Sequence, residues 1–296
     1  MWLLMDHRPD IDWPIVHRVV GLRAPRLPEI SRSEAHRVVA DIRLRAREAG
    51  AIAAKSLALP PGHATQDIVV VDRQGWTNAA SRMTEAAFER LGWPSRPDGF
   101  RRRALAMIIG AGVGVGFRVG STRLLGQFDA FSGRRTLYLV APNILVQERK
   151  WGFKPAAFRR WVGIHEQTHA IQFALAPWLP EYMLSLVRDA DGVGKLQEIT
   201  ALMTFLEGHA DYVSDHTGMV RGVKRMRDVF GRETKPRARL HDKRAQYTNG
   251  REFCVRVRRK TTPGGMLAAF DRPENLPTRS EIHDPDAWVR RVHGKA

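Results

Sequence analysis

The feature that most constrains the fold of this 296-residue chain is the pentapeptide HEQTH at 165–169, which has the pattern H-E-x-x-H. It lies in a stretch that is compatible with a single helix from Pro155 to Ala176. Residues four apart in a helix share a face about 6 Å apart along the axis, so His165 and His169 can converge on one ion. Glu166 then projects toward the open side of that ion. The motif predicts a helix that carries two metal ligands and a base.

A catalytic zinc site needs a third protein ligand, because tetrahedral zinc leaves only one position to water. The single cysteine, Cys254, cannot form a thiolate cluster, so the remaining ligand must be His, Asp or Glu. The metzincin continuation of the motif requires glycine at position 172 and histidine at position 175. The chain has Gln172 and Leu175 there, which excludes that class.

The helix predicted at 195–213 has an inward stripe of apolar residues, namely Leu196, Ile199, Met203, Leu206 and Ala210. Glu207 is the favoured third ligand, because it continues this stripe and would otherwise be an unpaired buried acid. Asp211 follows one turn later. In this E-x-x-x-D arrangement, Asp211 accepts the second imidazole N–H of His165 and orients the ring. His209, Asp211 and His216 remain rival ligands.

Three segments carry a specific resemblance: HEQTHAIQF at 165–173, EGHADYV at 207–213 and KRAQYTNGREF at 243–253. Together they resemble an actinobacterial family of zincin-like metallopeptidases, whose members are described as hydrolases associated with biosynthesis of the deazaflavin coenzyme. The similarity spans most of the chain. It implies a mostly helical zincin-like fold and a Zn²⁺ site at His165, His169 and Glu207, with Glu166 as base. It implies no particular substrate.

The predicted function is a zinc-dependent metallopeptidase or amide hydrolase that acts on a peptide or protein substrate. Glu166 would serve as general base for a zinc-activated water and pass the proton to the leaving amine. A further donor must stabilise the oxyanion, and the candidates are His209, His216, Tyr247 and Arg251. Tyr247 is favoured as a second catalytic residue because it lies within the resembling segment 243–253. The predicted strand Thr136–Val140 could be an edge strand that pairs with an extended substrate.

The positive charge of the chain raises two alternative functions. The net charge is +17, and residues 221–260 hold 15 basic and 4 acidic residues. Such a segment could meet nucleic acid, an acidic protein or anionic lipid, since all three present dense negative charge. Few aromatic side chains interleave with it for the stacking that nucleic-acid binding requires. We therefore interpret it mainly as solvated surface and expect no nucleic-acid partner. The alternatives are a catalytically inactive zinc-bearing binding or assembly protein and a basic nucleic-acid-associated protein.

The sequence indicates a cytoplasmic protein without membrane contact. A lone cysteine fits a reducing compartment. The longest uncharged stretch, Ala104–Phe117, has 14 residues, fewer than the ~20 that cross a bilayer. We expect it to be a buried core helix in which Gly112, Gly116 and Gly120, four residues apart, let a neighbouring backbone approach closely.

The predicted fold class is mainly α with a small β component. Residues 1–30 are broken by prolines and are expected to form a surface segment, and residues 31–296 a single zincin-like domain. We expect this domain to divide further into a helical part at 31–130 and a catalytic part at 131–296. The predicted elements are helices at 31–57, 77–92, 155–176, 180 onward and 195–213, and strands at 68–71 and 136–140.

Overall fold

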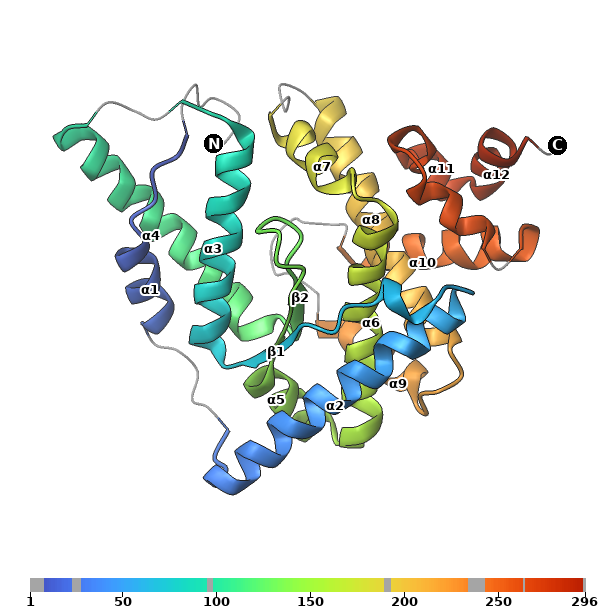
Figure 1. Cartoon of the computed structure of the whole chain (residues 1–296), viewed down its shortest axis with the longest axis horizontal. Helices are drawn as coiled ribbons and strands as arrows, with labels where there is room; N and C mark the ends of the chain where they lie inside the picture. The colour runs from blue at the N-terminus through green and yellow to red at the C-terminus, as the bar shows by residue number, and fades with distance from the viewer. Residues whose placement is uncertain are drawn as a thin grey trace. The chain divides into compact units, whose positions relative to one another are not determined.

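The computed structural model is mainly helical and contains one small three-stranded sheet, as predicted (Figure 1). It describes residues 8–22, 28–94, 98–188, 193–233, 243–262 and 264–294; the side chains of residues 193, 230–233 and 243–248 lie outside this description. The α-helices are α1 (Trp13–Gly21), α2 (Arg32–Ser56), α3 (Arg73–Leu91), α4 (Phe100–Arg123), α5 (Ala141–Trp151), α6 (Pro155–Leu175), α7 (Leu179–Arg188), α8 (Val193–His216), α9 (Val223–Glu233), α10 (Lys243–Lys260), α11 (Arg279–His283) and α12 (Pro285–His293). The strands and 3-10 helices are β1 (Ile68–Val71), β2 (Gly126–Phe128), β3 (Leu137–Val140), η2 (Pro61–His63), η3 (Gly265–Phe270) and η4 (Pro273–Asn275).

The chain forms two compact units. The first comprises Met1–Arg43 and Ile68–Lys150, and the second comprises Leu44–Asp67 and Trp151–Ala296. The expected single domain from residue 31, with its division near residue 130, stays a prediction.

The sheet lies in the first unit and has the strand order β1-β3-β2. β3 pairs parallel with β1, with Leu137 opposite Ile68, and antiparallel with β2. The prediction that Thr136–Val140 is an edge strand is wrong, because β3 is the central strand and its four residues are all buried. Both of its sides are occupied by protein strands, so it offers no edge to a substrate.

The N-terminal segment contains helix α1, which was not predicted because Pro14 lies within it and proline usually breaks a helix. Pro14 instead occupies the first turn, where a missing N–H costs nothing. The Asp12 side chain caps the helix by accepting from the backbone N–H of Ile15 at 3.0 Å. The apolar side chains of Val16 and Val20 are buried, so the segment contributes to the core of the first unit.

Helix α4 packs on α1, but through different glycines from those predicted. A Cβ atom on Gly110 would lie 2.7 Å from the Asp12 carbonyl oxygen, and one on Gly114 would lie 2.8 Å from Val19 Cβ. Gly112 and Gly116 instead face open space, and a Cβ atom on Gly120 would lie 2.7 Å from the Trp76 ring, a side chain and not a backbone. The expectation of a buried core helix is therefore wrong, since only one face of α4 is covered and the four-residue spacing does not tell which face that is.

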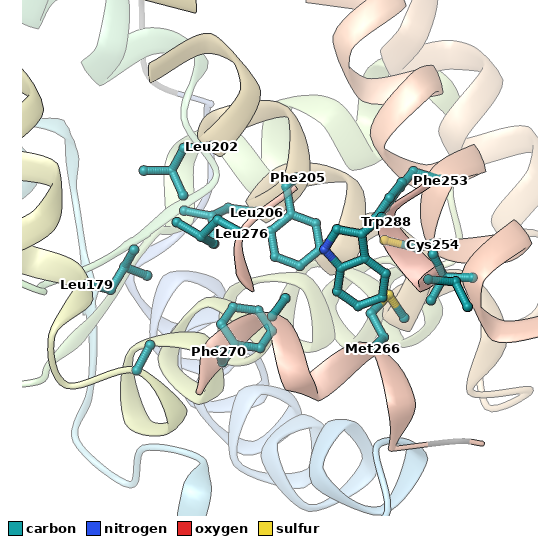
Figure 2. Close-up of a cluster of buried hydrophobic side chains, with 14 of the residues drawn as sticks. Leu179, Leu202, Phe205, Leu206, Phe253, Cys254, Met266, Phe270, Leu276 and Trp288 are labelled. Carbon is teal, nitrogen blue, oxygen red and sulfur yellow. The ribbon is translucent and has the colours of Figure 1, made fainter. Parts of the chain in front are cut away.

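A large hydrophobic cluster of the second unit is built around Phe205 of α8 (Figure 2). Its ring centroid lies 5.9 Å from that of Phe253 and 5.5 Å from that of Phe270. Trp288 continues the cluster at 5.6 Å from Phe253. These aromatic contacts join α8 to α10, η3 and α12 and hold the middle of α8 in place.

Two glycines allow α8 and α10 to cross at backbone contact. A Cβ atom on Gly208 of α8 would lie 2.2 Å from the carbonyl carbon of Gly250, and one on Gly250 would lie 2.0 Å from the carbonyl oxygen of Thr204. No side chain fits at either position unless the helices separate. Gly208 directly follows Glu207, so this crossing fixes the backbone that carries a predicted metal ligand.

Alanine at Gly250 should lower the free energy of unfolding by about 3 kcal/mol or more, because its methyl group overlaps the Thr204 carbonyl. Denaturant unfolding followed by circular dichroism measures this change. Gly112→Ala is the matched control, since it lies mid-helix and faces open space. The control should stabilise the protein by ~0.5–1 kcal/mol. Equal effects of the two changes would contradict the close crossing.

Candidate metal centre

Helices α6 and α8 pack side by side in the second unit and carry the site (Figure 1). The middle of the HEQTH segment anchors α6. The Gln167 side chain donates to the carbonyl oxygens of Ala46 at 3.1 Å and Thr65 at 2.9 Å, and accepts from the Thr65 N–H at 3.0 Å. Gln167 therefore has a structural role, and the histidines on either side of it face α8.

His165, His169 and Glu207 come together at one point. The Nε2 atoms of the two histidines lie 3.3 Å apart. Glu207 places its Oε2 3.4 Å from His165 Nε2 and its Oε1 3.8 Å from His169 Nε2. One possible ligand atom from each of the three residues lies within 4.8 Å of the other two. Among the described residues, these three side chains form the group that could hold a metal ion.

The chemistry of this donor set fits zinc. Two imidazole nitrogens and one carboxylate oxygen are the ligands of catalytic zinc sites with an open fourth position. The side chains of His165, His169 and Glu207 are 17%, 16% and 25% exposed, so none of them is sealed from solvent. The cluster has the composition of a catalytic site rather than a closed structural one.

Asp211 orients His165. Its Oδ1 lies 3.2 Å from His165 Nδ1, so this nitrogen carries the proton and Nε2 is left to coordinate. Burial would lower the pKa of His165, but the hydrogen bonds to Asp211 and Glu207 outweigh it and raise that pKa well above its ordinary value. Without a metal, Asp211 and Glu207 thus stabilise an imidazole that is protonated on both nitrogens. A bound cation would take the place of the proton on Nε2, while the proton on Nδ1 stays with Asp211.

Gln172 orients His169 in the same way, a role that was not predicted. Its Oε1 lies 2.9 Å from His169 Nδ1, and its Nε2 donates to the Leu206 carbonyl oxygen at 2.8 Å. The amide therefore presents its oxygen to His169, which places the proton on Nδ1 and leaves Nε2 for the metal. The sequence feature that could have predicted this role is the position of Gln172, one turn after His169 on the same face of the helix.

His209 is not part of the group formed by His165, His169 and Glu207, which disfavours it as a rival ligand. Its Nδ1 accepts from the Gln172 amide at 3.1 Å, and its Nε2 is buried without a hydrogen-bond partner in the described part of the chain. Burial, with a smaller effect from His169, lowers the pKa of His209 to about 3, so the ring is neutral at physiological pH. Its ring stacks on that of Phe205, with the ring centroids 6.0 Å apart.

The other candidates from the sequence lie elsewhere or remain open. His216 stacks on Tyr212 at 4.2 Å and is exposed at the end of α8. Arg251 pairs with the buried carboxylate of Asp215 at 2.6 Å, and Arg227 pairs with it too, so part of the basic segment 221–260 has a structural role. The side chain of Tyr247 lies outside the described residues, and its catalytic role stays a prediction.

Glu166 is buried beside the cluster. Burial raises the pKa of its carboxyl; the charges of His165 and His169 act in the opposite direction, and Glu207 adds to the increase. An elevated pKa brings a carboxylate closer to the range in which it can take and return a proton near neutral pH.

The model of the zincin-like metallopeptidase family matches residues 11–193 and 191–289. The chain belongs to this family. The match covers both α6 and α8, so His165, His169 and Glu207 all lie within the matched residues.

A solved structure shares the fold. A candidate hydrolase with a novel fold from Chloroflexus aurantiacus superposes with a TM-score of 0.73 and 22% identity, over 97% of this chain and 100% of that one. The comparison with curated proteins gave no match.

Asp211→Asn should retain zinc with ~10- to 100-fold lower affinity, because the amide orients His165 less strongly than the carboxylate does. Competition with a fluorescent zinc chelator measures the affinity. Glu207→Gln should weaken binding further, since it removes a charged ligand. If Asp211→Asn lost zinc completely while Glu207→Gln kept it, the two assigned roles would have to be exchanged.

Proposed function

We propose that this zincin-like chain is a zinc-dependent peptidase or amide hydrolase. The observation that carries the proposal is the convergence of His165, His169 and Glu207, with the buried carboxyl of Glu166 beside them. A zinc ion held there would lower the pKa of a water to about 7 and polarise a carbonyl.

Glu166 performs the proton transfers in this proposal. It takes a proton from the water whose oxygen forms a bond to the carbonyl carbon. It then delivers that proton to the nitrogen as the C–N bond breaks, so a carboxylic acid and an amine leave. The buried surroundings that raise its pKa favour both halves of this transfer. Asp211 and Gln172 keep the two imidazoles in the tautomers that leave Nε2 free.

The resemblance of segments 165–173, 207–213 and 243–253 supports membership of the actinobacterial group linked to the deazaflavin coenzyme, which we include in the proposal. Tyr247 is our candidate for oxyanion stabilisation, a role supported by its place in the last of these segments. Arg251 is a weaker candidate, because Asp215 already pairs with it. The single cysteine supports a cytoplasmic location.

Metal analysis and a peptide-library digest test the proposal together. Protein purified without added metal should contain one zinc per chain by elemental analysis. The same protein should cleave members of a mixed peptide library, read by mass spectrometry, and a chelator should abolish the cleavage. Folded protein that binds no zinc would refute the metal site. Zinc-loaded protein that cleaves nothing would instead support the inactive binding protein.

A further inference from the structure

Helix α4 presents a row of large apolar side chains to solvent. Ile108 is 70% exposed, Val115 is 58% exposed and Phe100 is 86% exposed, and Met107 and Val119 join them. At 100° per residue these five positions fall within an arc of about 120°, and at 1.5 Å per residue they extend over about 28 Å. We call these five residues the α4 face. A continuous apolar row of this kind marks an interaction surface.

The opposite side of α4 is fixed to its own unit, so the α4 face cannot turn inward. Gly110 and Gly114 hold it against α1 at backbone contact distance. The Phe117 ring lies between those of Trp13, at 5.9 Å, and Trp76, at 5.7 Å. The partner of the α4 face must therefore come from outside this unit.

The charges on α4 indicate what that partner is. The helix contains five arginines and no acidic residue. Arg101 and Arg103 are exposed before the apolar row and Arg123 is exposed after it, whereas Arg102 is paired with Asp10 and Asp98. An anionic bilayer complements this pattern, since its acyl chains accept the apolar side chains and its phosphates accept the flanking guanidinium groups.

The length of the helix decides how it meets the bilayer. Among the described residues, α4 is the helix long and apolar enough to cross a membrane by length and composition alone. However, its uncharged stretch Ala104–Phe117 rises about 21 Å, less than the ~30 Å hydrocarbon core. The covered side that packs on α1 also cannot be surrounded by lipid. The arrangement fits a helix that lies in the interface rather than one that spans it.

We propose that α4 docks the chain onto the surface of an anionic phospholipid bilayer. Ile108 and Val115 insert among the outer parts of the acyl chains, and Arg101, Arg103 and Arg123 pair with headgroup phosphates. This differs from the expectation of no membrane contact, which rested on the stretch 104–117 being too short to cross a bilayer and on its being buried as a core helix. A peripheral site on the inner leaflet is compatible with a cytoplasmic protein.

Vesicle co-sedimentation of the full chain tests the proposal. The protein should bind vesicles of phosphatidylcholine with about 30 mol% phosphatidylglycerol, bind pure phosphatidylcholine much more weakly, and dissociate as salt is raised. Ile108→Gln/Val115→Gln should lower the partition coefficient ~10-fold or more. Arg101→Gln/Arg103→Gln/Arg123→Gln should lower it ~10- to 100-fold. Unchanged partitioning of both variants would overturn the proposal.

Matched variants elsewhere on the chain distinguish binding through the α4 face from nonspecific binding through other exposed apolar or basic side chains. Leu196→Gln/Met219→Gln removes two exposed apolar side chains of the second unit. Arg221→Gln/Lys224→Gln/Arg259→Gln removes three exposed cations from the basic segment 221–260. Both sets should bind vesicles like the wild type. If the second set abolished binding while the α4 variants retained it, the basic segment would be the membrane site and the proposal would fail.

A fluorescent probe at Ile108 reports insertion directly. Cys254 is fully buried and burial raises the pKa of its thiol, so Ile108→Cys supplies the one reactive thiol. An environment-sensitive dye there should shift to the blue when anionic vesicles are added, whereas the same dye at Leu196→Cys should not. A dimer by light scattering, with a blue-shifted dye before any lipid is added, would show that a second copy covers the face and would overturn the proposal.

Discussion

Glu166→Gln should leave the zinc content unchanged and lower amide hydrolysis by ~10²-fold or more. Glutamine keeps nearly the shape of glutamate, so α6 and the imidazoles of His165 and His169 stay in place. A carboxamide cannot accept a proton from water, and the attacking oxygen then remains a poor nucleophile. Initial rates on a peptide found in the library digest, measured beside elemental analysis, give both quantities.

The matched control is Glu198→Gln, the same change at a partly exposed position of α8 that pairs with Lys195. It should alter neither zinc content nor rate. Equal rates for the wild type and Glu166→Gln would show that the cleavage comes from another site or a contaminant. Loss of zinc from Glu166→Gln would instead mean that this carboxyl holds the metal.

The residues that converge at the centre were predictable because their geometry is local to two helices. Helical spacing alone puts His165 and His169 on one face, and the same spacing puts Asp211 one turn after Glu207. The structure brings these residues together, with the cluster of His165, His169 and Glu207 and the contact of Asp211 with His165 Nδ1. Their chemical roles remain predictions for the variants described above.

The contacts between elements could not be predicted, because they depend on packing that sequence spacing does not encode. The close crossing of Gly208 and Gly250 joins residues 42 positions apart. The expected inward stripe of α8 included Leu196 and Met203, which are exposed, and missed Phe205, which is fully buried. Hydrophobic periodicity identifies a helix, whereas the neighbouring elements decide which of its faces is covered.

The same reason explains the two other errors. The β-branched and aromatic run at Thr136–Val140 predicts a strand, but an apolar run of this length does not reveal whether it has one neighbour or two. The glycines of α4 occur at every second position from Gly110 to Gly116, so two different four-residue rows were available. The structure packs Gly110 and Gly114 of one row against α1 and its N-cap, and leaves Gly112 and Gly116 of the other row open, while Gly120 meets the Trp76 ring.

His169→Ala should abolish stoichiometric zinc binding and, with it, all chelator-sensitive hydrolysis. Two ligands, His165 and Glu207, cannot hold zinc against the competition of water and buffer as three can. A substitution at His169 is easier to interpret in this test than one at His165. Removing His165 would leave the Asp211 carboxylate without the imidazole that it orients, and the loss of zinc could then be confused with a loss of structure.

Two companion variants show whether the effect of His169→Ala comes from coordination. His216→Ala removes an exposed histidine at the end of α8 and should keep full zinc content. Gln172→Leu removes the partner of His169 Nδ1 while the ligand remains, so zinc affinity should fall by only ~10- to 100-fold. The expected order of affinity is wild type and His216→Ala, then Gln172→Leu, then His169→Ala. Full zinc occupancy in a folded His169→Ala protein would mean that another side chain supplies the second nitrogen, and the ligand set would have to be redrawn.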